Sequence, residues 1–196
     1  MNKIYNNNSI LRHNWTSEEA KSIIDQPLLD LLFKSQTIHR SNFPKNEIQK
    51  SKLLSIKTGS CPEDCSYCSQ SAHHNVDLKK EPLISLGEVV KAAEDAVKEG
   101  ATRFCMGAAW RGPTDKNIDQ VCDMVEAVNG LGLESCVTLG MLKEGHAEKL
   151  AKSGLNYYNH NIDTSEEFYK SIITTRNFSD RIDTLEKVRN AGVKVC

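Results

Sequence analysis

The sequence predicts an α/β fold with a parallel sheet, in which strands and helices alternate along most of the chain. Apolar runs rich in β-branched and aromatic residues recur about every 30 residues, and segments with helix-start signals lie between them. Parallel strands need such helical crossovers. Because no linker rich in proline or serine interrupts the later part, we expect one domain over residues 51–196. An N-terminal arm and helical extension is expected over residues 1–50.

The expected elements begin with two helices. One starts near Ser17, which can cap it, and extends to Asp25; the other follows Pro27. A first strand is expected over residues 52–57. The elements that follow are expected in this order: a helix from 85 to 99, a strand over 102–106, a helix from 114 to 130, a strand over 134–139, a helix from 143 to 153, a strand over 156–161, a helix capped by residues 164–167, a helix from 179 to 190, and a strand that begins at 193.

This alternation is typical of a (β/α) barrel of the TIM type. A complete eight-unit barrel takes about 250 residues, so 196 residues supply about five strand–helix units. We therefore expect a partial barrel that is truncated at its C-terminus. Its last strand would then be an unprotected edge.

Composition and charge exclude several classes of partner. The formal net charge of −1 gives no electrostatic footprint for nucleic acid or for a membrane surface. No apolar run approaches the roughly 18 residues of a membrane span, and the N-terminus lacks an apolar signal core. Seven cysteines are too few for a disulfide scaffold. We expect a cytoplasmic protein whose thiols stay reduced and available to metals.

Three of the cysteines lie within eight residues. Cys61, Cys65 and Cys68 have C-x3-C-x2-C spacing, and Pro62 and the preceding Gly59 place them on a loop after the first strand. Thiolate-rich sites select iron–sulfur clusters or zinc. Closed zinc sites and electron-carrying clusters usually take four protein ligands, so three cysteines leave one metal position open for chemistry.

Three further cysteines follow the repeat of the fold. The intervals from Cys105 to Cys136 and from Cys136 to Cys196 are close to one and two strand–helix units. We expect their thiols at equivalent heights on strands two, three and five, where inward positions of a barrel converge. This predicts a second metal site. The polar run over residues 158–163, at the end of strand four, is expected to face the reaction.

The first cysteine spacing, with Tyr67 directly before the third cysteine, resembles the signature of the radical S-adenosylmethionine (SAM) enzymes. Longer stretches resemble the members of that family that insert sulfur into dethiobiotin to form biotin. Those stretches are residues 61–71, 104–110, 136–140 and 158–164. The resemblance covers about residues 51–196, and the N-terminal helices more loosely.

The resemblance implies two clusters. A [4Fe-4S] cluster would be held by Cys61, Cys65 and Cys68, with SAM on its fourth iron, and a [2Fe-2S] cluster by Cys105, Cys136, Cys196 and an arginine on a later strand. The residues implied to contact SAM are Tyr67, Gly107, Ala108, Asn161, Asp163 and Arg181. Asn161 would also approach the substrate. Residues 107–110 read Gly-Ala-Ala-Trp where many radical SAM enzymes carry a Gly-Gly-Glu-like segment.

The implied activity is that of a sulfurtransferase that converts dethiobiotin to biotin through a 5′-deoxyadenosyl radical. No side chain receives a role as acid, base or nucleophile, because the C–H bonds to be broken are too weakly acidic for a side-chain base. An electron donor such as flavodoxin or ferredoxin is implied, and a homodimer for the full-length protein. The alternatives are another radical SAM enzyme with a different small substrate, and a non-catalytic metal-binding fragment.

Several residues keep a simpler interpretation. The first three cysteines can form a zinc knuckle completed by His73 or His74, and the second three can be buried core residues. For His160 a role as a satisfied core residue is favoured, and Cys122 is interpreted as core. Trp110 can pack in the core or line the site. Arg103 can offset cluster charge or pair with a surface acid.

Overall fold

The computed structural model describes residues 12, 14–44 and 46–196. The chain divides into two compact units, Met1–Ile48 and Gln49–Cys196. The first unit contains α1 (Ser17–Ile24) and α2 (Leu28–Asn42). Thr16 caps α1, not Ser17 as expected, because Glu19 lies three residues after Thr16 and the two complete a capping box.

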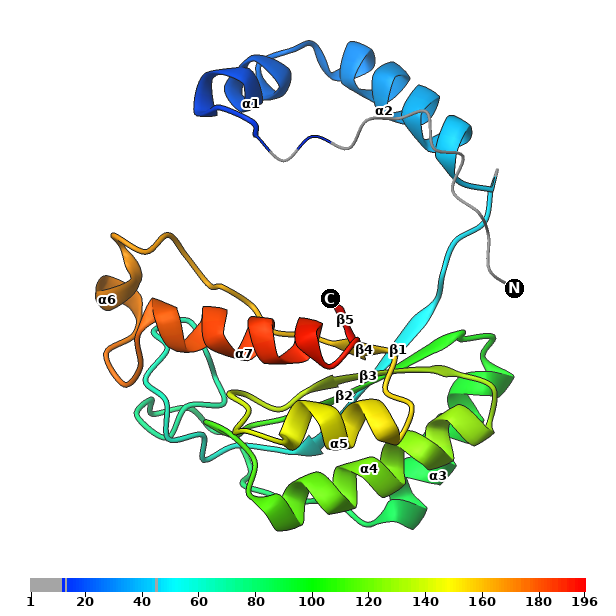
Figure 1. Ribbon diagram of the computed structural model, residues 1–196, viewed down its shortest axis with the longest axis vertical. Helices are drawn as coiled ribbons and strands as arrows, with labels where there is room; N and C mark the ends of the chain where they lie inside the picture. The colour runs from blue at the N-terminus through cyan, green and yellow to red at the C-terminus, as the bar shows by residue number, and fades with distance from the viewer. Residues whose placement is uncertain (1–11, 13, 45) are drawn as a thin grey trace. The chain divides into compact units, whose positions relative to one another are not determined.

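The second unit is built on a five-stranded parallel sheet. The strands lie in the order β1-β2-β3-β4-β5, so each strand pairs with the next along the chain. Its elements are β1 (Ser51–Lys57), α3 (Leu86–Lys98), β2 (Arg103–Ala108), α4 (Asp115–Gly130), β3 (Glu134–Thr138), α5 (His146–Lys152), β4 (Tyr157–Tyr158), α6 (Tyr169–Ile172), α7 (Phe178–Asn190) and β5 (Lys194–Val195). In Figure 1, α3, α4, α5 and α7 follow one another along the sheet. The expected α/β class with a parallel sheet is confirmed.

The main core lies between the sheet and these helices. Phe104 and Met106 of β2 and Val137 of β3 are fully buried there. Because side chains alternate along a strand, the neighbouring residues Cys105 and Cys136 lie on the opposite, inner face of the sheet. Complete burial of each large apolar side chain contributes about 1.5–3 kcal/mol. Because the residues that face the helices are committed to the core, the residues between them lie on the other face of each strand, and that face can line a site.

Several element ends differ from expectation. α6 begins only at Tyr169, and none of residues 164–167 caps it. The reason is local, since the Ser165 side chain bonds to the Glu167 carboxylate within a turn. Asn177, in a capping box with Asp180, caps α7, so Ser179 does not open that helix.

β4 is shorter than expected. It pairs only through Tyr157 and Tyr158, and the polar residues that follow leave the sheet. The same change of direction carries Asn161 and Asp163 to the pocket described below.

Two glycines allow the loops after β2 and β3 to cross closely. A Cβ on Gly112 would lie 2.4 Å from the carbonyl oxygen of Met141. Gly140 has a φ of +84°, and a Cβ there would lie 2.4 Å from the carbonyl oxygen of Arg111. The crossing is closed by a hydrogen bond from the backbone N–H of Met141 to the Arg111 carbonyl oxygen (2.8 Å). It holds Arg111 and its neighbour Trp110 at the rim of the pocket.

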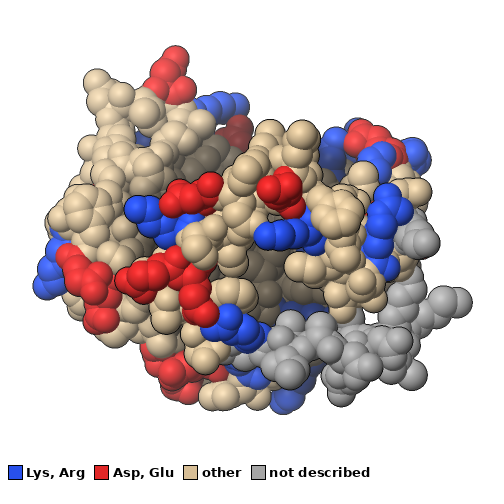
Figure 2. All heavy atoms as spheres, turned by 90° about the horizontal axis from the view of Figure 1, so that it is seen from above, with Lys and Arg blue, Asp and Glu red and all other residues tan. Residues whose placement is uncertain are grey.

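The described surface carries charges of both signs. In the face drawn in Figure 2, basic and acidic side chains alternate in small groups. Within the described ranges, no helix combines the length and apolar composition needed to cross a bilayer.

Candidate functional site

The loop that follows β1, residues 59–76, carries the first three cysteines and is called the cysteine loop below. It leaves the carboxyl end of β1, the end at which barrel enzymes place their sites. Gly59 and Ser60 have φ values of 71° and 54°, and this turns the chain directly before Cys61. The backbone N–H of Cys61 donates to the carbonyl oxygen of Gln70 (2.9 Å), which closes the loop.

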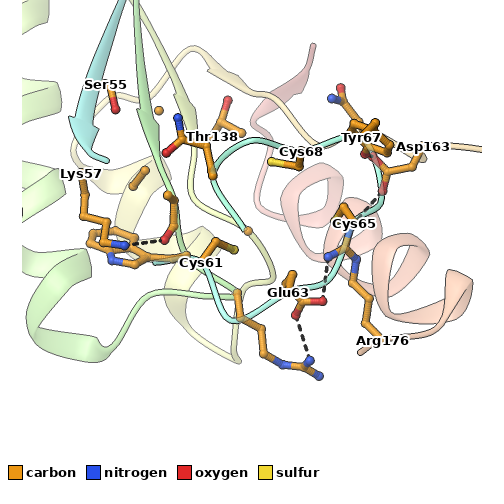
Figure 3. A pocket seen from close by; sticks show the side chains of 18 of the residues that line it. Ser55, Lys57, Cys61, Glu63, Cys65, Tyr67, Cys68, Thr138, Asp163 and Arg176 are labelled. Atoms are coloured by element: carbon orange, nitrogen blue, oxygen red, sulfur yellow. Dashed lines mark hydrogen bonds and ion pairs between the residues drawn. The ribbon is translucent and has the colours of Figure 1, made fainter. Parts of the chain in front are cut away.

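The cysteine loop borders a pocket of about 330 Å³. Cys61, Cys65 and Cys68 all line this pocket, and the first two are buried (Figure 3). All six residues expected to contact SAM line the same pocket. They are Tyr67, Gly107, Ala108, Asn161, Asp163 and Arg181. The structure thus brings together two sets of residues that come from four separate segments of the sequence.

The donor set suits a cluster better than a single ion. Among the described residues, no three His, Cys, Asp or Glu side chains are grouped to hold one metal ion. A zinc ion needs its donors about 2.0–2.3 Å from one point, whereas the cysteines of a [4Fe-4S] cluster each bind a different iron. His73 Nε2 and His74 Nε2 instead bond to the carbonyl oxygens of Pro62 (3.0 Å) and Cys65 (2.8 Å). The zinc knuckle therefore lacks its fourth ligand in this arrangement.

Asp163 is the most strongly held acid of the pocket. Its backbone has a φ of 74°, and its side chain accepts hydrogen bonds from Tyr67 Oη, Arg176 Nη2 (3.0 Å) and Arg181 Nη2 (3.1 Å). Burial alone would raise the pKa of Asp163, but the Tyr67 hydrogen bond and the two arginine charges outweigh it and lower that pKa. Burial and the bond to Asp163 raise the pKa of Tyr67. Asp163 is thus a fixed anion and Tyr67 a neutral donor.

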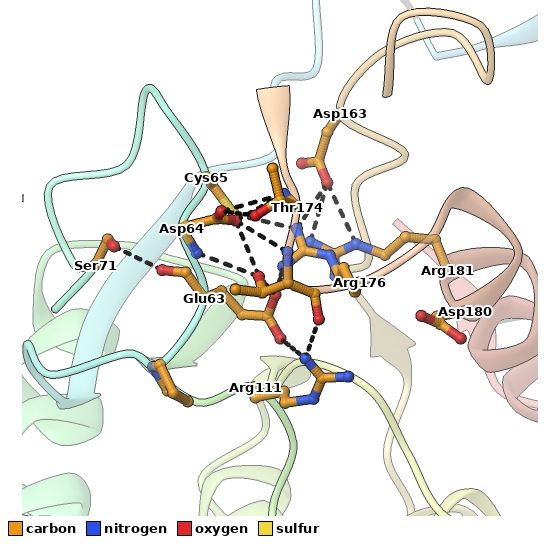
Figure 4. Close-up of polar contacts among 12 residues, drawn as sticks. Glu63, Asp64, Cys65, Ser71, Arg111, Asp163, Thr174, Arg176, Asp180 and Arg181 are labelled. Atoms are coloured by element: carbon orange, nitrogen blue, oxygen red, sulfur yellow. Dashed lines mark hydrogen bonds and ion pairs between the residues drawn. The ribbon is translucent and has the colours of Figure 1, made fainter. Parts of the chain in front are cut away.

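Arg176, which the sequence did not single out, joins the cysteine loop to Asp163. Its guanidinium donates to Tyr169 Oη (3.0 Å), Glu63 Oε2 (2.8 Å), Cys65 Sγ (3.2 Å) and Asp163 Oδ2. The residue is only 5% exposed. Figure 4 shows it between the loop and the acid.

The cysteine loop is also tied to the segment between α6 and α7. Glu63 accepts bonds from Arg111 (2.8 Å) and from the Thr175 hydroxyl. Asp64 accepts bonds from the backbone N–H groups of Thr174 (2.9 Å) and Thr175 (3.2 Å). The hydroxyl of Thr174 adds a third bond, and together these bonds lower the pKa of Asp64 despite the opposing effect of burial. Asp64 therefore holds the loop in place, and Glu63, which also lines the pocket, ties the loop to Arg111 and Thr175.

The sequence gives only a weak indication of these contacts. Two acidic residues inside a packed loop require positive or N–H partners, and Arg176 follows two threonines just before a helix. Nothing local indicates which arginine is the partner, since the contacts join residues more than 100 positions apart.

The second group of cysteines also comes together on the inner face. Cys105 and Cys136 are direct partners in the β2–β3 register. Cys196 lies two residues beyond the row of Cys136, because Tyr157 pairs with both Cys136 and Lys194.

The thiol of Cys136 interacts with those of Cys105 and Cys196. Cys136 bonds to both Cys105 and Cys196, and its pKa is raised by the Cys105 bond, by burial and by the other thiols. The same bond lowers the pKa of Cys105 to about 7. Cys105 and Cys136 are thus neighbours on the inner face, whereas Cys196 lies two residues further along the register. A metal site formed by all three thiols stays a prediction.

The remaining candidate residues have mostly structural surroundings. His160 is 3% exposed and accepts a hydrogen bond from Arg181 (3.1 Å), and burial and the arginine charges lower its pKa to about 3. Trp110 both packs against the core and lines the pocket. Arg103 pairs with Glu134 (2.9 Å) and lies over the ring of Tyr157 at 3.7 Å. Cys122 packs against the core from α4, as interpreted.

The fold, the cysteine loop and the pocket together define a class of enzyme. The Radical SAM superfamily model matches residues 55–196, and the chain belongs to that superfamily. Curated relatives named biotin synthase are similar over nearly the whole chain. One from Psychromonas ingrahamii is 57% identical over 190 residues, covering 97% of this chain and 54% of the relative. One from Colwellia psychrerythraea is 58% identical over 189 residues, covering 96% and 55%. The chain spans about half the length of the curated relatives it matches.

Solved structures agree on the fold. Methylornithine synthase (PylB) superposes with a TM-score of 0.74 at 15% identity, covering 92% of this chain and 54% of that one. HydG, a maturase of the [FeFe]-hydrogenase, superposes with a TM-score of 0.70 at 18% identity, covering 91% and 42%. The expected partial barrel is confirmed at this level.

Proposed function

We propose that this chain is the cluster- and SAM-binding part of a biotin synthase-like sulfurtransferase that converts dethiobiotin to biotin. The observation that carries the proposal is the shared pocket: three cysteines and all six residues implied to contact SAM line one cavity. The sequence identity of 57% to a protein named biotin synthase favours the conversion of dethiobiotin to biotin as the reaction. The direct pairing of Cys105 with Cys136 on the inner face of the sheet, with Cys196 acting on the pKa of Cys136, supports it further.

In this proposal the chain's residues bind and orient two clusters. Cys61, Cys65 and Cys68 would hold the [4Fe-4S] cluster at the pocket, and Cys105, Cys136 and Cys196 the [2Fe-2S] cluster. When bound, the first cluster would supply the electron that cleaves SAM to a radical, and this radical would remove hydrogen from the substrate. The second cluster would supply the sulfide that the substrate carbon acquires.

The pocket residues would position SAM and exclude water. Gly107 has no side chain, so the pocket stays open at β2. A Cβ added at this position would lie 3.9 Å from the side chain of Leu53. Asp163, ionised and fixed by two arginines, offers an anion to the hydroxyl or ammonium groups of a ligand. Asn161 would contact SAM and the substrate. Trp110 and Leu53 supply apolar lining, which limits the access of water to a radical.

Two partners belong to the proposal. A small one-electron donor such as flavodoxin or ferredoxin would reduce the first cluster. The full-length protein would form a homodimer.

The test is anaerobic reconstitution of the chain with iron and sulfide. We expect iron and sulfide contents of both clusters, an EPR signal of the reduced [4Fe-4S] cluster that added SAM perturbs, and 5′-deoxyadenosine formation that depends on dethiobiotin. Cys65→Ser should remove the SAM-sensitive signal and Cys136→Ser only the second cluster. Cys122→Ser is the matched control and should keep both. An EPR signal that SAM leaves unchanged would contradict the proposal, and a chain with one cluster would favour a different radical SAM enzyme.

A further inference from the structure

Arg176 is the one buried cation in direct contact with a pocket cysteine among the described residues. Its Nη2 lies 3.2 Å from Cys65 Sγ and 3.0 Å from Asp163 Oδ2, so a single nitrogen touches both the cysteine loop and the pocket acid. Its Nη1 donates a hydrogen bond to Glu63, and its Nε donates one to Tyr169. Four directed bonds fix the plane of the guanidinium.

This arrangement is specific to arginine. A lysine ammonium has no planar fork and cannot direct parallel N–H groups at two acids and a sulfur. The two carboxylates alone would justify a buried arginine, but neither requires an N–H group aimed at a cysteine. The contact with Cys65 is therefore a separate feature of the site.

An N–H donor to a metal-bound sulfur stabilises extra negative charge on a cluster. Hydrogen bonds to the sulfurs and nearby charge are among the factors that set the potential of iron–sulfur centres. A cluster gains one negative charge on reduction, so a buried guanidinium next to Cys65 favours the reduced form.

We propose that Arg176 is a positioning residue that sets the reduction potential of the cluster at Cys61, Cys65 and Cys68 and aligns the cysteine loop with Asp163. This inference rests on the proposed function, because it concerns the cluster that function requires. It assigns to Arg176 a role that a purely structural ion pair would not have.

The test is a redox titration, followed by EPR, of the anaerobically reconstituted chain and its Arg176→Gln variant. We expect the potential of the variant to fall, with about tenfold less reduced cluster at a given potential, which corresponds to about 59 mV for one electron. The matched control is Arg111→Gln. Arg111 also binds Glu63 but touches no cysteine, so its loss should leave the potential unchanged.

Arg176→Lys provides a second variant in case glutamine prevents cluster assembly. The lysine keeps the charge but loses the directed N–H bonds, and we expect a smaller shift in the same direction. An unshifted potential in both cluster-loaded Arg176 variants, or an equal shift in the Arg111 control, overturns the inference alone. A wild-type chain that takes up no [4Fe-4S] cluster overturns the proposed function, and the inference with it.

Discussion

The ion pair between Glu63 and Arg176 gives a prediction whose size follows from burial. Both side chains are 3% exposed, whereas Arg111, the other partner of Glu63, is 47% exposed. Breaking a fully buried pair by removal of one partner costs about 3–5 kcal/mol, and an exposed pair contributes about 0–1 kcal/mol. Glu63→Gln keeps one carbonyl acceptor, so we expect the low end, about 3 kcal/mol. For a unit of this size each kcal/mol lowers the Tm by about 2–4 °C, which gives roughly 6–12 °C.

The assay is thermal unfolding of the metal-free chain, followed by circular dichroism in a reducing buffer. The metal-free state separates loop stability from cluster binding. Arg111→Gln is the control, since it removes only the exposed partner and should lower the Tm by no more than about 4 °C. Equal shifts in the two variants would show that burial does not determine the contribution of this pair, and the reasoning that the buried Arg176 depends on its carboxylate partners would fail.

Three further predictions concern the backbone and acid stability. Gly140→Ala should strongly destabilise the chain in urea unfolding, because the new Cβ would lie 2.4 Å from a carbonyl oxygen at a φ of +84°, whereas Gly87→Ala, with open space around it, should not. The low pKa of Asp64 means that the unfolded state binds more protons below about pH 3.8, so stability should fall there in the wild type and less in Asp64→Asn. The pKa of His160, lowered to about 3, should leave its imidazole NMR signals unchanged from pH 8 to 5 and make stability fall as the pH drops from 6.5 towards 3. A titration of His160 near pH 6.5 would contradict its burial beside Arg181.

The alternation of strands and helices was predictable because it rests on local signals. The capping box at Ser85 and Glu88, and the threonine at the start of α4, place helix ends to within a residue. The start of α6 was predicted wrongly, since the acids and hydroxyls near residue 165 bond to one another in a turn that a capping pattern does not distinguish from a helix start. The early end of β4 was also missed, because the residues that follow it are held by tertiary contacts, such as those of Asp163 with Arg176 and Arg181, that no local pattern indicates.

The candidate site shows the same limit. Both cysteine groups could be placed from spacing, because one lies on a single short loop and the other repeats with the strands. The contacts of Arg176 could not, since its four partners come from three segments of the sequence and no periodicity links them.

Strand parity explains why the two cysteine groups share one face. Phe104, Met106 and Val137 must lie in the apolar core against the helices, and a shift of one residue would turn all of them to the other side. That requirement fixes Cys105 and Cys136 on the inner face without any contribution from a metal. The cysteine loop starts at the carboxyl end of β1, the neighbour of β2, and therefore opens towards that same face. The relative placement of the two groups is thus a consequence of core packing, so insertion or deletion of one residue in β2 should disturb both sites together.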